Sequence, residues 1–316
     1  MPEIDTQVPT AVGDLGAIIR LPDHNEPLPG VVLVDGSGDG DRLDYGGWPE
    51  WIGQAGSVTL RHDKPGCGGS PGHWTAQSFE DRAEESLAAL NVLREHPATA
   101  GQKVGLYGIS QGGWVALLAA ALAPEEVDFV ICHSGPGTSP AVQERDRLNK
   151  ELAEAGHPEA IEAEAMAWVD ERLERLRGGE DIEGILADQS RLADRPWYST
   201  VTFAGNTVAE LEFFRRILDF DPAHVLPQVH CPLLALFGGA DSLVPVQESL
   251  AIFAEHLPPA PADHGFVVFP GANHGLFIAD PDPAIPRRDQ LAPGYLAIIE
   301  SFLRDRQQAA QTLVTA

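Results

Sequence analysis

A serine stands at the centre of the segment Gly108-Ile-Ser-Gln-Gly112, which has the pattern Gly-x-Ser-x-Gly. This pattern is typical of a tight turn from a strand into a helix, with the serine hydroxyl exposed at the turn. Glycine is favoured at both ends because a side chain there would collide with neighbouring backbone. An exposed hydroxyl in this setting can attack a carbonyl carbon, so we predict that Ser110 is a nucleophile.

A serine hydroxyl is a poor nucleophile near neutral pH and needs a general base within hydrogen-bond reach. Histidine suits this task because its ordinary pKa of about 6.5 lies near the working pH. His274 follows the strand-like run Gly265-Phe-Val-Val-Phe269 and is therefore expected near the carboxyl end of that strand. His230 and His264 precede strand-like runs, at the opposite end of the sheet. The predicted base is His274.

Asp241 supplies the third group of a serine, histidine and acid arrangement. An imidazole that acts as a base needs a carboxylate to fix its tautomer and to stabilise the imidazolium ion. Asp241 follows the run Leu236-Phe-Gly-Gly-Ala240 and is expected at the carboxyl end of a strand. A lone aspartate there is usually a turn or helix cap. The chain order Ser110, Asp241, His274 matches one known class of triad, which favours the catalytic interpretation.

Two backbone N–H groups are candidates for binding the oxyanion that such a reaction forms. The serine turn itself provides the N–H of Gln111. The loop Asp35-Gly-Ser-Gly38 provides the second, for which Ser37 is our choice. The alternative interpretation of this loop is a plain glycine-rich turn.

The segments that must position these residues alternate between strand-like and helix-like patterns, which predicts an α/β protein with a mostly parallel sheet covered by helices. The predicted strands are 17–21, 31–34, 57–61, 103–107, 127–132, 231–237 and 265–269. The predicted helices include 77–95, 114–123 and 292–304. Since ligands bind at the carboxyl ends of the strands in such sheets, the three predicted catalytic residues are expected to meet at one edge.

A helical insertion interrupts this alternation. From residue 141 to about 219 the sequence contains amphipathic helical runs and no clear strand. We therefore predict a core made of residues 1–137 and 221–316 and a cap made of residues 138–220 that covers the serine.

Aromatic residues of the predicted cap are candidates for shaping a substrate pocket. Six of them are Trp168, Trp197, Tyr198, Phe203, Phe213 and Phe214. Aromatic residues at helical spacing usually belong to a core, so we expect only a few of the six to contact substrate. The candidates are Trp168, Trp197, Phe213 and Phe214.

The net charge of −26 argues against two classes of partner, because nucleic acid and anionic membrane surfaces would be repelled. No apolar run approaches the roughly 20 residues that span a bilayer. The segment Met1-Pro-Glu-Ile-Asp5 lacks the basic and apolar regions of a secretion signal, which predicts a cytoplasmic protein. The oligomeric state is left open, and the acidic surface allows a homodimer.

Neither a cofactor nor a metal is indicated. Cys67, Cys132 and Cys231 are too few for a disulfide framework, and their spacing matches no metal site. The carboxylates of Asp39 and Asp41 also follow no coordination pattern. We therefore expect a small-molecule ester or thioester substrate and no cofactor or metal.

Taken together, these features resemble the α/β-hydrolase superfamily from about residue 12 to residue 304. The resembling stretches are Gly36-Ser-Gly-Asp-Gly-Asp-Arg42, Arg61-His-Asp-Lys-Pro-Gly-Cys-Gly-Gly-Ser70, the serine turn, Phe237-Gly-Gly-Ala-Asp241 and Gly271-Ala-Asn-His274. The first two are similar to the branch of esterases and acyl-thioester hydrolases, which also resembles peptidase-like members. The resemblance implies the α/β-hydrolase fold, with Ser110 as nucleophile, Asp241 as acid, His274 as base, and Ser37 and Gln111 as oxyanion donors.

Two positions depart from the pattern of that family. Asp35-Gly36 stands where His-Gly is common before the oxyanion residue, and Pro65 stands where a second basic residue is common. The neighbouring residues Arg61, His62 and Asp63 are expected to form a structural network under the active-site loops.

These inferences predict a serine hydrolase that cleaves a carboxylic ester or thioester of a small, fairly apolar molecule through an acyl-enzyme on Ser110. The same triad leaves open a peptidase or amidase, a carbon–carbon bond hydrolase, and a biosynthetic acyltransferase or cyclase that excludes water. A non-catalytic binding protein is disfavoured by the complete triad. Dehalogenation is disfavoured because it needs an aspartate in place of Ser110.

Overall fold

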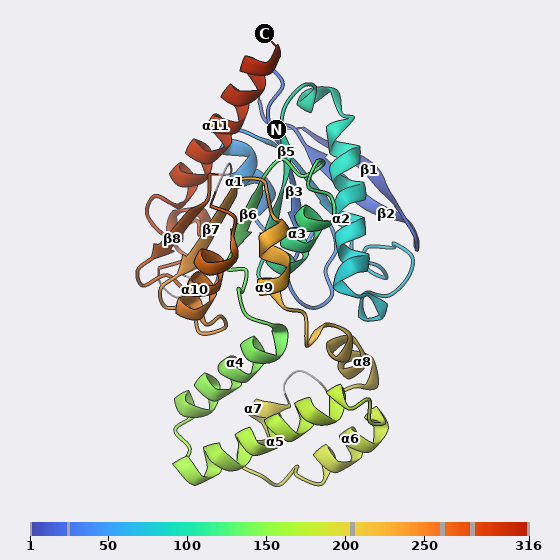
Figure 1. Ribbon diagram of the computed structural model, residues 1–316, viewed down its shortest axis with the longest axis vertical. Helices are drawn as coiled ribbons and strands as arrows, with labels where there is room; N and C mark the ends of the chain where they lie inside the picture. Colours follow the sequence, from blue (N-terminus) through green and yellow to red (C-terminus); the bar gives the residue numbers. More distant parts are fainter. Residues whose placement is uncertain (1, 24–25, 203–205, 260–262, 279–281, 315–316) are drawn as a thin grey trace.

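Eight strands form one sheet in the described part of the chain (Figure 1). The structure is a computed structural model and describes residues 2–23, 26–202, 206–259, 263–278 and 282–314, with side chains as far as residue 307. The strands are β1 (Glu3–Thr10), β2 (Gly13–Arg20), β3 (Gly30–Val34), β4 (Val58–His62), β5 (Val104–Ile109), β6 (Val130–His133), β7 (Leu233–Gly238) and β8 (Gly265–Phe269). Their order across the sheet is β1-β2-β4-β3-β5-β6-β7-β8. β1 and β2 run antiparallel to their neighbours, and the other strands are mutually parallel, as predicted.

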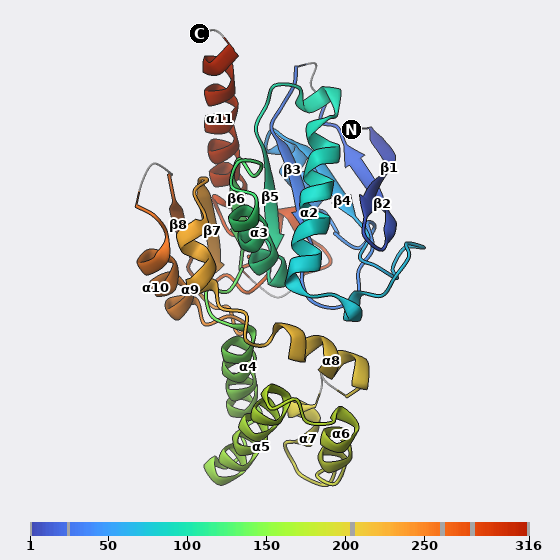
Figure 2. The same cartoon turned by 45° about the vertical axis from the view of Figure 1, so that its right-hand side comes forward.

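Helices cover both faces of this sheet. The helices of the core are α1 (Trp48–Gln54), α2 (Phe79–Arg94), α3 (Gln111–Leu122), α9 (Pro222–Val225), α10 (Val246–His256) and α11 (Tyr295–Val314). Side chains of α2, α3 and α10 belong to one hydrophobic cluster, and those of α1 and α11 belong to a second. α2 and α3 lie side by side in both views (Figures 1 and 2).

The central strands are buried on both faces, which explains the continuous apolar runs of β3 and β7. Every residue of β3, β4, β6 and β7 is buried. β1 was not predicted, because it is a mostly exposed edge strand whose residues, Glu-Ile-Asp-Thr-Gln-Val-Pro-Thr, are largely polar. α1 and α10 were not predicted either, since both are short and border loops rich in glycine or proline.

The described residues within 138–220, which we call the cap, form a helical unit below the sheet (Figures 1 and 2). The helices described there are α4 (Pro140–Glu154), α5 (Glu159–Arg177), α6 (Ile182–Ser190), α7 (Tyr198–Val201) and α8 (Val208–Ile217). β6 leads directly into α4, so the cap lies on the side of the sheet where the parallel strands end. The cap has its own hydrophobic cluster, distinct from the two clusters of the core.

Helix α8 attaches the cap to the core. Phe213 and Ile217 of α8 belong to the hydrophobic cluster of α2 and α3. The rings of Phe213 and Trp74 meet edge to face, with centroids 5.3 Å apart. Arg216 donates a hydrogen bond of 2.6 Å to the carbonyl oxygen of Thr75, which lies in a short 3₁₀ turn, η1 (Trp74–Ala76). These contacts hold α8 against the core, on the side of the sheet where the central strands end.

Candidate active site

Ser110 lies at the turn between β5 and α3, where its backbone has φ 53° and ψ −119°. This conformation is strained for a residue with a side chain, and such strain is concentrated at functional sites. The turn is also tight. A Cβ added at Gly108 would lie 2.2 Å from the carbonyl oxygen of Gly112, and one added at Gly112 would lie 2.1 Å from that of Val34. The glycine pattern around Ser110 therefore has a steric cause.

His274 and Asp241 meet in the loops that follow β8 and β7. Nδ1 of His274 donates a hydrogen bond of 2.8 Å to Oδ2 of Asp241. Oδ1 of Asp241 accepts from the backbone N–H groups of Leu243 and Val244, at 2.8 and 3.1 Å. The carboxylate is fully buried and the imidazole is 22% exposed. This arrangement fixes the tautomer of His274 and leaves Nε2 as the nitrogen that can accept a proton.

The segment after β6 connects the neighbourhoods of Ser110 and His274. The N–H of Ser110 donates to the carbonyl oxygen of His133 at 2.8 Å. The hydroxyl of Ser134 donates to the carbonyl oxygen of His274, also at 2.8 Å. Two of the predicted catalytic residues are thus bound to adjacent residues of one loop. The Ser110 hydroxyl forms no hydrogen bond with His274 in the described residues, and such catalytic contacts often tighten only when substrate binds.

A second imidazole lies beneath the site and is excluded as the base. Nδ1 of His133 hydrogen-bonds with the hydroxyl groups of Tyr107 and Tyr295, at 2.6 and 2.9 Å. Burial, together with the charge of the nearby His274, lowers the pKa of His133 to about 3. The two tyrosines thus hold the buried imidazole of His133, and its backbone carbonyl oxygen supports the serine turn.

Lys64 holds the predicted oxyanion loop after β3. Its Nζ donates to the carbonyl oxygens of Gly36 and Gly38, at 2.7 and 2.6 Å, and lies 3.0 Å from Oδ2 of Asp35. The lysine side chain is almost completely buried, and this burial, with the charge of Arg82, lowers its pKa to about 8. Asp35, which departs from the family pattern, is the counter-charge of this lysine. Ser37 lies between the two clamped carbonyl groups.

Arg82 joins the segments of the two predicted oxyanion donors. Nη1 of this buried arginine on α2 donates to Oε1 of Gln111 at 2.6 Å, and Nη2 donates to the carbonyl oxygen of Asp35 at 2.7 Å. Gln111 is the first residue of α3, where backbone N–H groups have no partner within the helix. Sequence reasoning missed Arg82 because its partners are 29 and 47 residues away along the chain.

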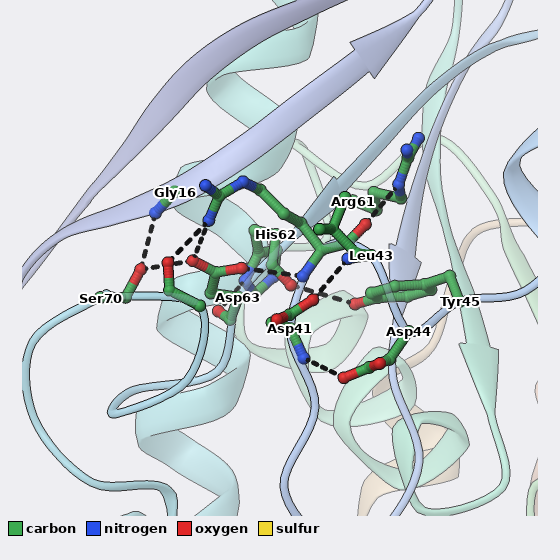
Figure 3. Close-up of polar contacts among 11 residues, drawn as sticks. Gly16, Asp41, Leu43, Asp44, Tyr45, Arg61, His62, Asp63 and Ser70 are labelled. Carbon is green, nitrogen blue, oxygen red and sulfur yellow. Dashed lines mark hydrogen bonds and ion pairs between the residues drawn. The ribbon is translucent and has the colours of Figure 1, made fainter.

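The carboxylate of Asp63 is the centre of a polar network that joins the loops containing Arg42 and Ser70 (Figure 3). This buried carboxylate accepts from the N–H of Arg42 at 2.8 Å and from the hydroxyl of Ser70 at 2.7 Å, and it pairs with the Arg42 guanidinium. The hydroxyl of Ser70 accepts from the N–H of Gly16 on β2. Nε of Arg61 donates to the carbonyl oxygen of Arg42 at 2.6 Å. The network links two loops to the sheet, which is the structural role that the sequence indicated.

A cavity of about 400 Å³ lies between the core and the cap. Ser37 and Gln111 belong to its wall on the core side, and Phe213 and Phe214 belong to its wall on the cap side. Ser110 and His274 are not part of the wall, although Ser110 adjoins Gln111 in the chain. The wall combines apolar side chains with polar and charged ones, among them Asp39, Glu144, Arg172 and Glu210, and a cavity of this size can hold a small molecule.

The aromatic residues that were candidates for substrate contact fall into two groups. Phe213 and Phe214 line the cavity. Trp168 and Trp197 do not line it and instead pack in the hydrophobic cluster of the cap, where they are 7% and 1% exposed. Their large apolar rings are needed there because the cap has a core of its own. Phe203 lies outside the described residues.

The described ranges contain neither a metal-binding cluster nor a membrane-spanning helix. There, no three or more His, Cys, Asp or Glu side chains are grouped so that they could hold a metal ion. Among the same residues, no helix is long and apolar enough to cross a membrane. All three cysteines are free thiols, and burial raises the pKa of Cys132 and of Cys231 to about 12.

The sheet order, the serine turn and the loops around it are those of an α/β hydrolase. The family model described as "Serine aminopeptidase, S33" matches residues 26–282, and the chain belongs to this family. Solved structures of α/β hydrolases match nearly the whole chain, so the predicted fold is confirmed. A comparison with curated proteins gives no match.

Three solved structures illustrate the proteins to which this chain is similar. GrgF, an α/β hydrolase from Penicillium sp. sh18, is 20% identical with a TM-score of 0.62, over 98% of this chain and 100% of that chain. Est1E from Butyrivibrio proteoclasticus, with bound ferulic acid, is 16% identical with a TM-score of 0.57, over 96% and 99%. Dipeptidyl peptidase 4 from Porphyromonas gingivalis is 17% identical with a TM-score of 0.59, over 96% and 35%. At these identities the similarity shows the fold alone.

Proposed function

We propose that this α/β hydrolase is a serine hydrolase that cleaves a carboxylic ester or thioester of a small, largely apolar molecule. The observation that carries the proposal is the hydrogen bond between His274 and the buried Asp241, in loops bound to the same segment as Ser110. A strained serine, an oriented imidazole and a clamped oxyanion loop are the parts that acyl transfer requires.

The proposed reaction proceeds through an acyl-enzyme. Oγ of Ser110 attacks the carbonyl carbon while Nε2 of His274 accepts the hydroxyl proton, and the N–H groups of Ser37 and Gln111 bind the oxyanion. The leaving alcohol or thiol takes the proton from His274 and departs. Water, deprotonated by His274, then releases the acid from Ser110. Asp241 keeps Nδ1 of His274 protonated, because two backbone N–H groups hold its carboxylate in place.

Labelling and mutation of Ser110 test the nucleophile. A fluorophosphonate probe is expected to attach once, at Ser110, and Ser110→Ala is expected to lower hydrolysis of short 4-nitrophenyl esters by at least about 10³-fold. Ser78→Ala, at the start of α2, is the control and is expected to keep full activity. Undiminished turnover by Ser110→Ala, or labelling of another residue, would refute the assignment.

A peptidase or amidase is the second candidate, and the family description favours it. An aminopeptidase needs a carboxylate for the terminal ammonium group, and Asp39, Glu144 and Glu210 line the cavity. The two glutamates are already engaged, and Asp39 is exposed. Glu144 accepts two hydrogen bonds from Arg147, at 2.7 and 2.8 Å, and Glu210 accepts from the N–H of Thr207 at the start of α8. Ester cleavage is therefore the better supported reaction.

Matched substrates separate these two candidates. We would compare kcat/KM for a 4-nitrophenyl ester and a 4-nitroanilide that carry the same acyl group, and we expect cleavage of the ester alone. A further pair of aminoacyl anilides, with a free and with an acetylated amine, tests the terminal ammonium directly. Preferred cleavage of the free-amine anilide would establish the peptidase instead.

A further inference from the structure

Arg172 of α5 is a buried cation inside the cap. The residue is only 4% exposed. Its Nη1 donates to Oε1 of Gln189 at 3.0 Å and to the carbonyl oxygen of Val201 at 3.3 Å. Both of these acceptors are neutral, so the guanidinium charge is not compensated by them. A charged side chain is rarely buried to this extent unless it is paired.

No ion pair of Arg172 occurs among the residues that the structure describes, and the neighbouring arginine of the cap shows the contrast. Arg147 on α4 is also largely buried, and it binds Glu144 through two nitrogens and Glu151 through the third, at 2.5 to 2.8 Å. Its charge is fully matched. Burial lowers the pKa of Arg172 and the negative charge of Glu144 partly offsets this, but both oxygen atoms of the Glu144 carboxylate already accept hydrogen bonds from Arg147.

Arg172 lies at the cavity between core and cap. Arg172 is part of the cavity wall, together with Phe213, Phe214 and Trp74. Its Nε and Nη2 form no hydrogen bond in the described part of the chain, yet neither atom is sealed from solvent. These two N–H groups lie on one edge of the planar guanidinium, which is the edge that a carboxylate binds with two parallel hydrogen bonds.

We propose that Arg172 binds a carboxylate of the substrate, so that the substrate class is an ester or thioester with an apolar body and an acidic group remote from the scissile bond. This inference rests on the proposed function, because the same cavity reaches Ser37 and Gln111 at its other end. A carboxylate here would match the buried charge, whereas an ammonium group would lie against a guanidinium. Arg172 is the one lysine or arginine among the described residues that line this cavity, and it fits a single negative charge.

Two pairs of esters, each differing by one carboxylate, test the proposal. One pair, 4-nitrophenyl hydrogen glutarate and 4-nitrophenyl valerate, places the charge on the acyl side. The other pair, 4-carboxyphenyl butyrate and phenyl butyrate, places it on the alcohol side. We expect the native enzyme to prefer the charged member of one pair, and Arg172→Met to reduce kcat/KM for that member roughly tenfold to a hundredfold. The value for the neutral member is expected to change little.

Three further variants distinguish recognition from folding. Arg177→Met on the same helix removes an exposed arginine that pairs with Asp219, and it is expected to leave both selectivities unchanged. Arg172→Gln keeps a donor for Val201 and replaces Arg172→Met if the latter does not fold. Arg172→Lys keeps the charge without the planar edge and is expected to fall between the native enzyme and Arg172→Met. An equal loss for charged and neutral esters, or no preference in either pair, would overturn the proposal.

A binding measurement separates failure of this inference from failure of the proposed function. If no ester is hydrolysed at all, the proposed function fails, and calorimetric titration with glutarate then decides the role of Arg172. Binding by the native protein that is lost in Arg172→Met supports the carboxylate site without any reference to catalysis. Equal binding by both proteins, or binding by neither, refutes it.

Discussion

The core and the cap differ in how their buried charged side chains are paired. In the core, Asp241 accepts hydrogen bonds from one imidazole and two backbone N–H groups, and Lys64 contacts three oxygen atoms. In the cap, Arg172 is buried, and its Nε and Nη2 donate no hydrogen bond to the described residues. Fully matched groups hold loops in one arrangement, whereas an unmatched group leaves a place for a ligand. The comparison suggests that the core sets the reaction and the cap selects the substrate.

The largest expected effect comes from the matched side of this comparison. Asp241→Asn is expected to lower kcat by about 10⁴-fold with little change in KM, because an amide can no longer hold Nδ1 of His274 protonated. Steady-state kinetics on a 4-nitrophenyl ester measure it. Asp63→Asn is the control, since Asp63 is also fully buried but belongs to the network in Figure 3. If Asp63→Asn lost kcat as severely, the division between catalytic and structural carboxylates would be wrong.

Within the cap, the comparison is sharpened by two aromatic residues. Trp197→Ala removes a ring from the hydrophobic cluster of the cap and is expected to lower the free energy of unfolding by about 3–5 kcal/mol. Phe214→Ala removes a half-buried ring from the cavity wall, so it is expected to cost less stability and to shift the preferred acyl length instead. Denaturant unfolding and kcat/KM across acyl lengths measure both. A shift in acyl preference caused only by Trp197→Ala would reverse the assignment.

Lys64 tests whether the clamp on the oxyanion loop matters for the rate. Lys64→Met removes three contacts that fix the carbonyl groups around Ser37, and kcat is expected to fall roughly tenfold to a hundredfold with a smaller change in KM. Lys150→Met is the control, because Lys150 is a surface lysine of the cap that pairs with Asp146. Equal kinetics of Lys64→Met and the native enzyme would show that the loop holds its shape without the lysine.

The smallest expected effect is the pH dependence of stability and of kcat that arises from Lys64. Its pKa of about 8 in the folded protein lies below the ordinary value of 10.5. Between these two pH values the folded chain binds fewer protons than the unfolded chain, so this group makes the folded state more stable as the pH rises. The rate is expected to move the other way, because a neutral amine no longer attracts Asp35. We expect kcat to fall about fivefold above pH 8 in the native enzyme, and this step to be absent in Lys64→Met.

The effect of Lys64 on the pH dependence of stability is measured separately from its effect on the rate. The free energy of unfolding of the native protein, relative to Lys64→Met, is expected to increase from pH 8 to pH 10 in denaturant titrations. A relative stability that decreases over this range would show that the lysine is not desolvated as the structure indicates.

The elements predicted best were those with a strong local pattern. The runs of β3 and β7 are apolar because these strands are buried on both faces, and their predicted ranges, 31–34 and 231–237, lie close to the observed ones. β1 escaped prediction because an edge strand with exposed residues has no hydrophobic alternation to detect. Local pattern therefore revealed the buried elements and missed an exposed one.

The residues of the candidate site also divide into those that the local sequence pattern could reveal and those that it could not. Ser110, Asp241 and His274 could be selected because each follows an element whose end is visible in the sequence. Lys64, Arg82 and Arg172 could not be selected, although Lys64 lies inside a stretch that resembles the family. Their partners are 17 to 47 residues away, and nothing in the local pattern indicates which buried charge will be matched. The structure was needed to find them.

The sequence by itself determined the alternation of strands and helices, the tight serine turn and the order of the predicted triad, because these depend on residue type and spacing along the chain. Tertiary structure alone decided which aromatic rings line the cavity, which residues clamp the oxyanion loop, and that Arg172 is buried without a carboxylate. These properties depend on contacts between segments that are remote in the chain. The balance of buried charge exists only after those segments have packed together.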